Sequence, residues 1–153
     1  MRRFFLGLIF LSVTACDPSR VYEANFDFPE RYWAKEIQPA FKFNITHTGK
    51  HNLYFNIRNE SSFRNANIYF TYYLSDTTGQ ILETKLKSEF LFDGKTGEPF
   101  GRTVLGDIFD HQLLISNLDF EKTGAYIMKY EQFTREDSLA GILSVGLRVE
   151  RAD

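Results

Sequence analysis

Hydrophobic and polar residues alternate strictly along the chain from Pro39 onward. Residues 41–46 place phenylalanine or isoleucine at every second position, and residues 53–58 repeat this pattern after a turn at residues 48–50. A period of two residues indicates a β-strand with one buried face, because successive side chains of a strand point to opposite sides. Two such strands joined by a short turn predict a β-hairpin.

The alternation continues through the rest of the chain. Further strands are predicted at residues 67–74, 81–92, 112–117, 125–133 and 142–150. In the first of these, one face is expected to be buried and carries Ile68, Phe70, Tyr72 and Leu74. Residues 136–140 are expected to form one helical turn. Seven or eight short strands with turns between them predict an all-β fold, an antiparallel β-sandwich of the immunoglobulin-like or jelly-roll-like type.

Two connections carry further signals. Residues 93–107 are rich in glycine and are longer than a usual hairpin loop, and such loops tend to be functional or disordered. Tyr126 begins a late strand directly after an acidic turn that contains Gly124. This pattern resembles the tyrosine corner of Greek-key sandwiches, in which the tyrosine hydroxyl bonds back to the preceding corner. We therefore expect Tyr126 to be structural and the loop of residues 94–107 to offer a contact surface.

The first sixteen residues follow a different pattern. Arg2 and Arg3 precede an apolar stretch at residues 4–13, and small residues then lead to Cys16, the only cysteine of the chain. A charged start, a short apolar stretch and small residues before the cut are the marks of a secretory signal peptide. The apolar stretch is shorter than the roughly 20 residues of a transmembrane helix, which disfavours an uncleaved anchor. A cysteine directly after the cut indicates a bacterial lipobox, so we expect Cys16 to be acylated and to hold the protein on an envelope membrane.

The remaining chain is long enough for one domain. Removing residues 1–15 leaves about 138 residues, which bury roughly two thirds of their unfolded surface. Residues 16–38 show no sustained period and are expected to form the lipidated N-terminus and a tether, with Trp33 packed on an edge of the domain. Residues 39–153 are expected to form the β-sandwich. Removing the signal peptide also moves the formal charge from −2 to about −4, which argues against a nucleic-acid partner.

No arrangement of reactive side chains predicts a catalytic, cofactor or metal site. His47 and His51 flank one turn, but a metal would need a third ligand, so two exposed turn histidines are expected. His111 has no serine nucleophile in a recognisable motif. A glycoside hydrolase would need two paired carboxylates. Surface positions are the default expectation for the four candidates, which are Asp107, Asp110, Asp119 and Glu131.

Candidate contact residues lie on the faces opposite the predicted core. Tyrosine in such a position stacks on sugar rings, anchors a protein interface or packs under a second layer, and the three candidates are Tyr54, Tyr69 and Tyr73. Arginine is enriched at interaction hot spots, and the three candidates are Arg58, Arg135 and Arg148. Surface salt bridges explain these arginines equally well.

Short stretches across the chain occur in the order and spacing of one family. They are Cys16-Asp17, Val21-Tyr22-Glu23, Asn52-Leu53-Tyr54 running to Ile57-Arg58-Asn59, Gly106-Asp107, Gly124-Ala125-Tyr126, Tyr130-Glu131-Gln132 with Arg135, and Gly141-Ile142 leading to residues 145–150. They cover nearly all of the chain after the signal peptide. On these stretches the chain resembles the gliding-motility lipoprotein family GldH of the Bacteroidetes. Residues 133–134 depart from the smaller pair that the resemblance leads us to expect.

The resemblance implies a non-enzymatic lipoprotein that is required for gliding over surfaces. It implies no cofactor, and its expected partners are other envelope proteins of the gliding machinery. Cys16 alone carries over with a chemical role, and both the inner and the outer membrane are compatible with the sequence. The alternative function is a glycan-binding envelope lipoprotein that uses exposed aromatic side chains. This alternative requires Tyr54, Tyr69 and Tyr73 to lie together on one exposed flat or grooved face.

Overall fold

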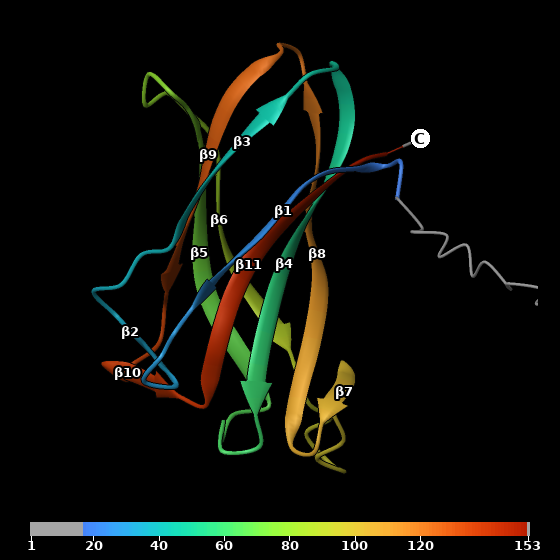
Figure 1. Cartoon of the computed structure of the whole chain (residues 1–153). Coiled ribbons are helices and arrows are strands. Elements are labelled where there is room, and N and C mark those ends of the chain that lie inside the picture. The colour runs from blue at the N-terminus through green and yellow to red at the C-terminus, as the bar shows by residue number, and fades with distance from the viewer. Residues whose placement is uncertain (1–16, 153) are drawn as a thin grey trace, which may run out of the picture.

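Two antiparallel β-sheets face each other across a hydrophobic core in the computed structural model, which describes residues 17–152 (Figure 1). The five-stranded sheet contains, in spatial order, β1 (Arg20–Asp27), β11 (Ile142–Arg151), β4 (Gly49–Glu60), β8 (Ile108–Phe120) and β7 (Arg102–Leu105). The four-stranded sheet contains β3 (Ala40–Ile45), β9 (Gly124–Gln132), β5 (Asn67–Asp76) and β6 (Ile81–Phe90). A small sheet pairs β10 (Ser138–Ala140) with β2 (Tyr32–Ala34).

These sheets confirm the predicted all-β antiparallel sandwich, although short strands occur that the periodicity did not predict. None of the described residues forms a helix long and apolar enough to cross a membrane. Cys16 and the predicted signal peptide lie outside the described residues.

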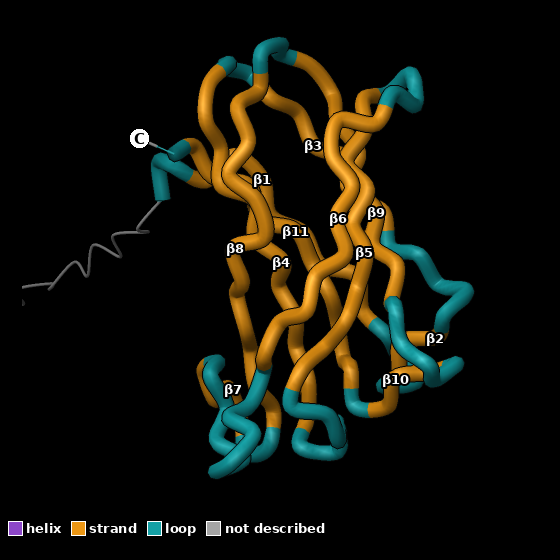
Figure 2. Tube along the Cα trace, turned by 180° about the vertical axis from the view of Figure 1, so that it is seen from behind, coloured by secondary structure: helices purple, strands orange, loops and turns teal. Residues whose placement is uncertain are grey.

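The core forms from alternate side chains of the two facing sheets, which appear as separate layers in Figure 2. β5 buries all four residues predicted for its inner face, and β4 buries Leu53, Phe55 and Ile57 from the opposite sheet. The ring of Phe55 stacks on Phe70 with 4.0 Å between centroids, and Tyr130 packs edge-on against Phe55 at 4.9 Å. A fully buried side chain of this size contributes about 1.5–3 kcal/mol by leaving water, so these contacts hold the layers together.

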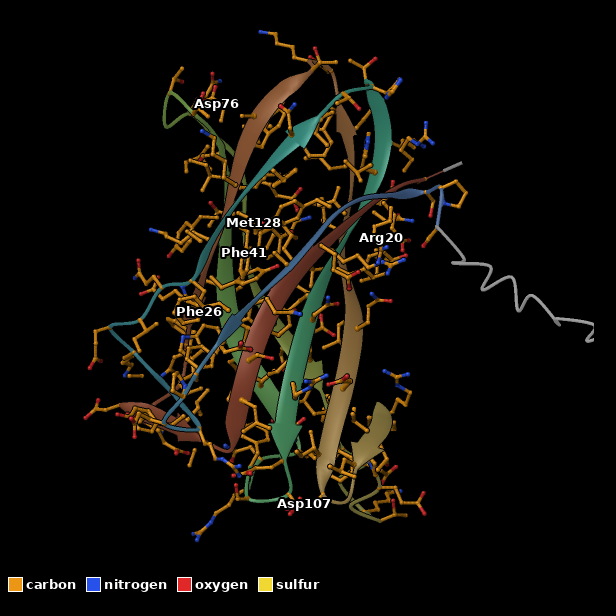
Figure 3. The ribbon with its side chains drawn as sticks, in the orientation of Figure 1. Arg20, Phe26, Phe41, Asp76, Asp107 and Met128 are labelled. Atoms are coloured by element: carbon orange, nitrogen blue, oxygen red, sulfur yellow. The ribbon has the colours of Figure 1, made fainter. Side chains whose placement is uncertain are left out.

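The predicted hairpin between residues 41–46 and 53–58 is wrong. β3 and β4 follow each other in the chain, but β3 pairs with β9 in one sheet and β4 pairs with β11 and β8 in the other. The turn between them crosses from layer to layer, and Gly49 adopts a φ of 113°, which favours glycine. Phe41 of β3 and its register partner Met128 of β9 lie between the layers (Figure 3). The two strands show the same alternation because both face one core from opposite sides.

The folded domain begins earlier than residue 39, the boundary expected from the pattern. β1 runs along β11 at the edge of the five-stranded sheet, and its alternation is weak because most of its side chains are exposed. Trp33, expected on an edge of the domain, is fully buried. Its ring stacks on Phe28 with 5.7 Å between centroids, and its indole N–H donates to the Ile37 carbonyl at 2.8 Å. Residues 20–38 therefore contribute strands and core side chains, where a tether was expected.

Two local predictions have opposite outcomes. The expected helical turn at residues 136–140 is wrong, because Ser138–Ala140 form β10 and pair with β2. The buried Leu139 lies opposite Trp33 in this pairing, so packing at this end of the sandwich favours an extended backbone. The tyrosine corner is confirmed, since the Tyr126 hydroxyl donates to the Lys122 carbonyl at 2.7 Å.

Candidate functional site

The six candidate contact residues divide between the two outer faces of the sandwich. The outer face of the five-stranded sheet carries Tyr54, Arg58 and Arg148, and the four-stranded sheet with the loop after β9 carries Tyr69, Tyr73 and Arg135. The three tyrosines therefore do not share one face. The physical reason is that β4 and β5 belong to different layers, whose outer sides point in opposite directions.

Arg148 is surrounded by acidic side chains on the five-stranded sheet. Its guanidinium lies 2.5 Å from Asp17 Oδ2 and 3.2 Å from Glu23 Oε2, and it also pairs with Glu150. Hydrogen bonds from the Ser19 hydroxyl and amide, together with the charge of Arg148, lower the pKa of Asp17. These contacts fix Asp17, the residue directly after Cys16, to the surface of the sheet.

Arg58 is also engaged in an ion pair on this face. Its Nε and Nη2 donate to Asp110 Oδ1 and Oδ2 at 2.6 and 2.8 Å, across the β4–β8 register. The hydrogen bonds from Arg58 lower the pKa of Asp110, and Arg102 lies 3.7 Å from the same carboxylate. Asn56 and Gln112 line the adjoining polar cavity of about 520 Å³. Arg58 and Arg148, the two candidate arginines on the five-stranded sheet, therefore both have carboxylate partners, and their role in partner contacts stays a prediction.

Tyr73 and Arg135 have different surroundings on the other sheet. The Tyr73 hydroxyl donates to Glu131 Oε2 at 2.8 Å, and the Lys129 ammonium lies 4.9 Å from the centre of its ring. The hydrogen bond to Glu131 raises the pKa of Tyr73. Arg135 is exposed and has no ion-pair partner within the described part of the chain. Arg135 and Tyr69 line one cavity of about 420 Å³.

Sequence reasoning missed three exposed apolar side chains that adjoin Tyr69. We define the aromatic patch as Tyr69, Leu86, Phe90 and Phe133, whose exposed fractions are 44%, 55%, 58% and 59%. The Phe133 amide donates to the Tyr69 carbonyl at 2.9 Å, and Tyr69 lies opposite Ser88, which has Leu86 and Phe90 two residues to either side. All four side chains thus lie on the outer face of the four-stranded sheet.

The inner face of the edge strand β6 is charged, which reverses the usual alternation. Glu83, Lys85, Lys87 and Glu89 lie opposite core residues of β5. The Glu83 carboxylate accepts hydrogen bonds from the Tyr72 hydroxyl and from Ser116 of the facing sheet, the latter at 3.1 Å. Burial raises the pKa of Tyr72, and the contact with Glu83 adds to this effect. Inward-pointing charges protect an exposed edge strand from pairing with other chains, and the same register turns Leu86 and Phe90 toward solvent.

The histidines form no group that resembles a metal centre. His51 was expected to be exposed, but it is 2% exposed, and its Nδ1 lies 2.9 Å from the Gly49 carbonyl oxygen. His47 is exposed, as expected. His111 is buried with its ring 6.0 Å from that of Phe92, and burial lowers its pKa. Among residues 17–152, no three His, Cys, Asp or Glu side chains converge in a way that could hold a metal ion.

The carboxylates considered for hydrolysis are dispersed over the molecule. Asp110 is paired with Arg58 on the five-stranded sheet, and Glu131 accepts from Tyr73 on the four-stranded sheet. Asp107 lies at the lower end of the sandwich in Figure 3, in the turn between β7 and β8. Asp119 is twelve residues further along, near the other end of β8. No facing pair among these four supports glycoside hydrolysis.

Comparison with known structures finds partial likeness to chains of two viral particles. A chain of the infectious bursal disease virus VP2 subviral particle matches 97% of this chain at a TM-score of 0.45 and 14% identity. A chain of infectious bursal virus derived T=1 particles matches the same share at a TM-score of 0.47 and 14% identity. This chain spans only 38% and 36% of those viral chains.

Comparison of sequences finds a relative of similar length. The gliding motility lipoprotein GldH homolog of Christiangramia forsetii is 28% identical over 166 aligned positions, which cover 100% of this chain and 99% of the relative. The model of the GldH lipoprotein family matches residues 20–149, from the start of β1 almost to the end of β11. Because this match covers most of the sequence, the chain belongs to the GldH lipoprotein family.

Proposed function

We propose that this protein is a non-enzymatic component of the gliding-motility apparatus, anchored to an envelope membrane through acylated Cys16 and acting through protein–protein contacts. Family membership and the relative named as a gliding motility lipoprotein support the role in motility. The lipobox pattern before Cys16 supports the anchor. The observation that carries the contact role is the aromatic patch on the four-stranded sheet.

The aromatic patch has the composition of a protein-binding surface. Its four side chains are between 44% and 59% exposed, although an extended apolar area on a monomer surface is costly unless it is covered by a partner. The exposed Arg135 adjoins Tyr69, and arginine and tyrosine are enriched among residues that dominate binding energy. Polar side chains at Glu131 and Lys129 continue the same sheet face and provide a hydrophilic rim.

The alternative of glycan binding has weaker support. It required three tyrosines on one exposed face, but Tyr54 lies on the sheet opposite to Tyr69 and Tyr73. The ring of Tyr73 is already covered by Lys129, and its hydroxyl is bonded to Glu131. Protein contact through the aromatic patch is therefore the function that the surface supports best.

Gliding of single cells and colony spreading test this proposal in a deletion strain. Complementation with wild type is expected to restore motility, whereas Cys16→Ala and the double variant Leu86→Ser/Phe133→Ser are expected to leave cells non-gliding at normal protein levels. Leu114→Ser is the matched control, because Leu114 is 52% exposed on the opposite outer face. Normal gliding of the deletion strain would contradict the motility role. Normal gliding with the double variant would contradict the patch as the contact surface.

A further inference from the structure

A cavity of about 710 Å³ opens between the two sheets beside the start of β1, and its charged lining is entirely basic. Arg20 and Arg151 contribute from the five-stranded sheet, and Lys42 contributes from β3 of the four-stranded sheet. His47 and His51 also line the cavity. No carboxylate of residues 17–152 lines this cavity, although the chain carries a formal net charge of −2.

Two of these three cations have no acidic partner within the described range. Arg20 pairs with Glu23, with 3.0 Å between Nη1 and Oε2. Arg151 instead donates from Nη2 to the neutral Pro18 carbonyl at 3.0 Å, and Lys42 is exposed without an ion pair. The cavity therefore holds positive charge that the described chain does not neutralise.

The rest of the cavity lining is partly apolar. Val21, Tyr22 and Phe43 form this part, and the rings of Tyr22 and Phe43 lie 5.9 Å apart. Tyrosine is enriched where one end of a side chain is in an apolar phase and the other in water. A ligand that fits both parts of the lining carries an anionic group next to an apolar body.

The cavity lies next to the first described residues of the chain, which follow the expected lipidation site in the sequence. Pro18 is part of the lining, and the Arg151 amide donates to the Ser19 carbonyl at 2.9 Å. Asp17 is held by Arg148, and Pro18 of the lining comes two positions after Cys16 in the sequence. Arg20 marks this corner of the sandwich in Figure 3. Because only Asp17 separates the expected lipidated residue from Pro18 of the lining, we expect the membrane that receives the acyl chains to lie near this corner.

We propose that this cavity binds the phosphate headgroup of an anionic phospholipid in the same membrane that receives the acyl chains of Cys16. The inference rests on the anchor of the proposed function and specifies how the domain is seated on the membrane. Anionic lipids attract each Lys or Arg near their surface, and the acyl anchor keeps headgroups at high local concentration. The seated domain presents its N-terminal corner to the bilayer and leaves the aromatic patch free for a protein partner.

Hydrogen exchange of the native acylated protein in vesicles tests the proposal. The protein is reconstituted in phosphatidylcholine alone or with about 30% phosphatidylglycerol, whose phosphate is not balanced by choline. We expect exchange in residues 18–22 and 42–47 to be about tenfold slower in the anionic vesicles. The variants Lys42→Glu/Arg151→Glu and Lys42→Gln/Arg151→Gln are expected to lose this difference. Arg64→Glu/Lys95→Glu, at exposed positions in loops at the opposite end of β4, is the matched control and is expected to retain it.

Each outcome decides one part of the inference. Equal exchange in both vesicle types, or unchanged protection in both charge variants, would overturn the headgroup site. Equal protection by inorganic phosphate added to phosphatidylcholine vesicles would overturn the lipid as its source. Intact mass of the purified protein reports acylation of Cys16 separately. An unmodified Cys16 with protection in anionic vesicles would support the cavity while refuting the anchor.

Discussion

Replacing Arg148 with alanine is expected to destabilise the protein at neutral pH and to release Asp17 from the sheet. The Arg148 side chain is 17% exposed and pairs with an equally protected Glu150, so losing this pair removes a charge-assisted hydrogen bond of about 1.5 kcal/mol. The pairs with Glu23 and Asp17 are more exposed and contribute little. Repulsion among the three remaining carboxylates adds to the loss. We expect the free energy of unfolding to fall by about 2 kcal/mol, which lowers the urea midpoint by about 1 M.

The effect of this substitution is expected to depend on pH. The pKa of Asp17 is lowered below 3.8 in the folded protein, so its ionised form stabilises the fold above pH 3.8. This stabilisation is lost as the pH falls through the folded pKa, where the carboxylate becomes protonated. Urea unfolding followed by the fluorescence of Trp33, the only tryptophan, measures the midpoints at about pH 7 and about pH 3. Because Ser19 makes the largest contribution to this pKa shift and Arg148 a smaller one, the difference between wild type and Arg148→Ala is expected to narrow, without vanishing, at the lower pH.

Arg148→Lys provides the matched control for this experiment. Lysine keeps the positive charge but lacks the planar guanidinium that contacts several carboxylates. A urea midpoint between those of wild type and Arg148→Ala is therefore expected. Equal midpoints for wild type and Arg148→Ala at about pH 7 would refute the stabilising role of the cluster. A loss of the same size at both pH values would refute its electrostatic origin.

Three further substitutions test the core, the buried histidine and the β1 edge. Phe55→Ala is expected to cost about 3–5 kcal/mol in thermal unfolding because it removes a fully buried ring, whereas Phe100→Ala, at a 62% exposed position, is expected to change little. Burial lowers the pKa of His111 below 6.5, so the unfolded chain binds its proton more tightly and stability falls as the pH drops below 6.5. His111→Leu is expected to reduce the change of the urea midpoint between about pH 7 and about pH 5. An unchanged pH dependence of the midpoint in this variant would assign that dependence to other groups. Gly146→Ala is expected to lower the free energy of unfolding by about 1–3 kcal/mol and to speed hydrogen exchange in β1. The reason is that the added Cβ would overlap the Asn25 side chain and the backbone of β1. Unchanged hydrogen exchange in β1 would contradict this packing.

The strands that were predicted and those that were missed show where the sequence is informative. β5 lies in the middle of its sheet with one apolar face, so the alternation of residues 67–74 identified both the strand and its buried side. β1 and β10 were missed because an edge strand and a three-residue strand have too few buried positions to show a period. The tyrosine corner was predictable because it depends on contacts between neighbours in the chain.

The candidate contact surface was only partly predictable. Tyr69 and Arg135 were identified from residue type and expected exposure, and they do adjoin each other. Leu86 and Phe90 were missed because alternation normally assigns apolar residues to the core, whereas β6 turns its charged side inward. Hydrogen bonds of Glu83 with Tyr72 and Ser116 stabilise the inward-pointing charge. These three residues lie far apart in the chain.

By itself, the sequence determined the all-β class, most strands and the corner at Tyr126, and it predicts the lipobox at Cys16. Each of these features depends on the types of residues within one short segment of the chain and on the spacing between them. Only the tertiary structure decided that β3 and β4 lie in opposite layers, that the tyrosines divide between two faces, and that basic residues from both sheets meet beside Asp17. Backbone hydrogen bonds between strands are chemically the same for almost every residue, so the choice of neighbours depends on how all the side chains fill one core.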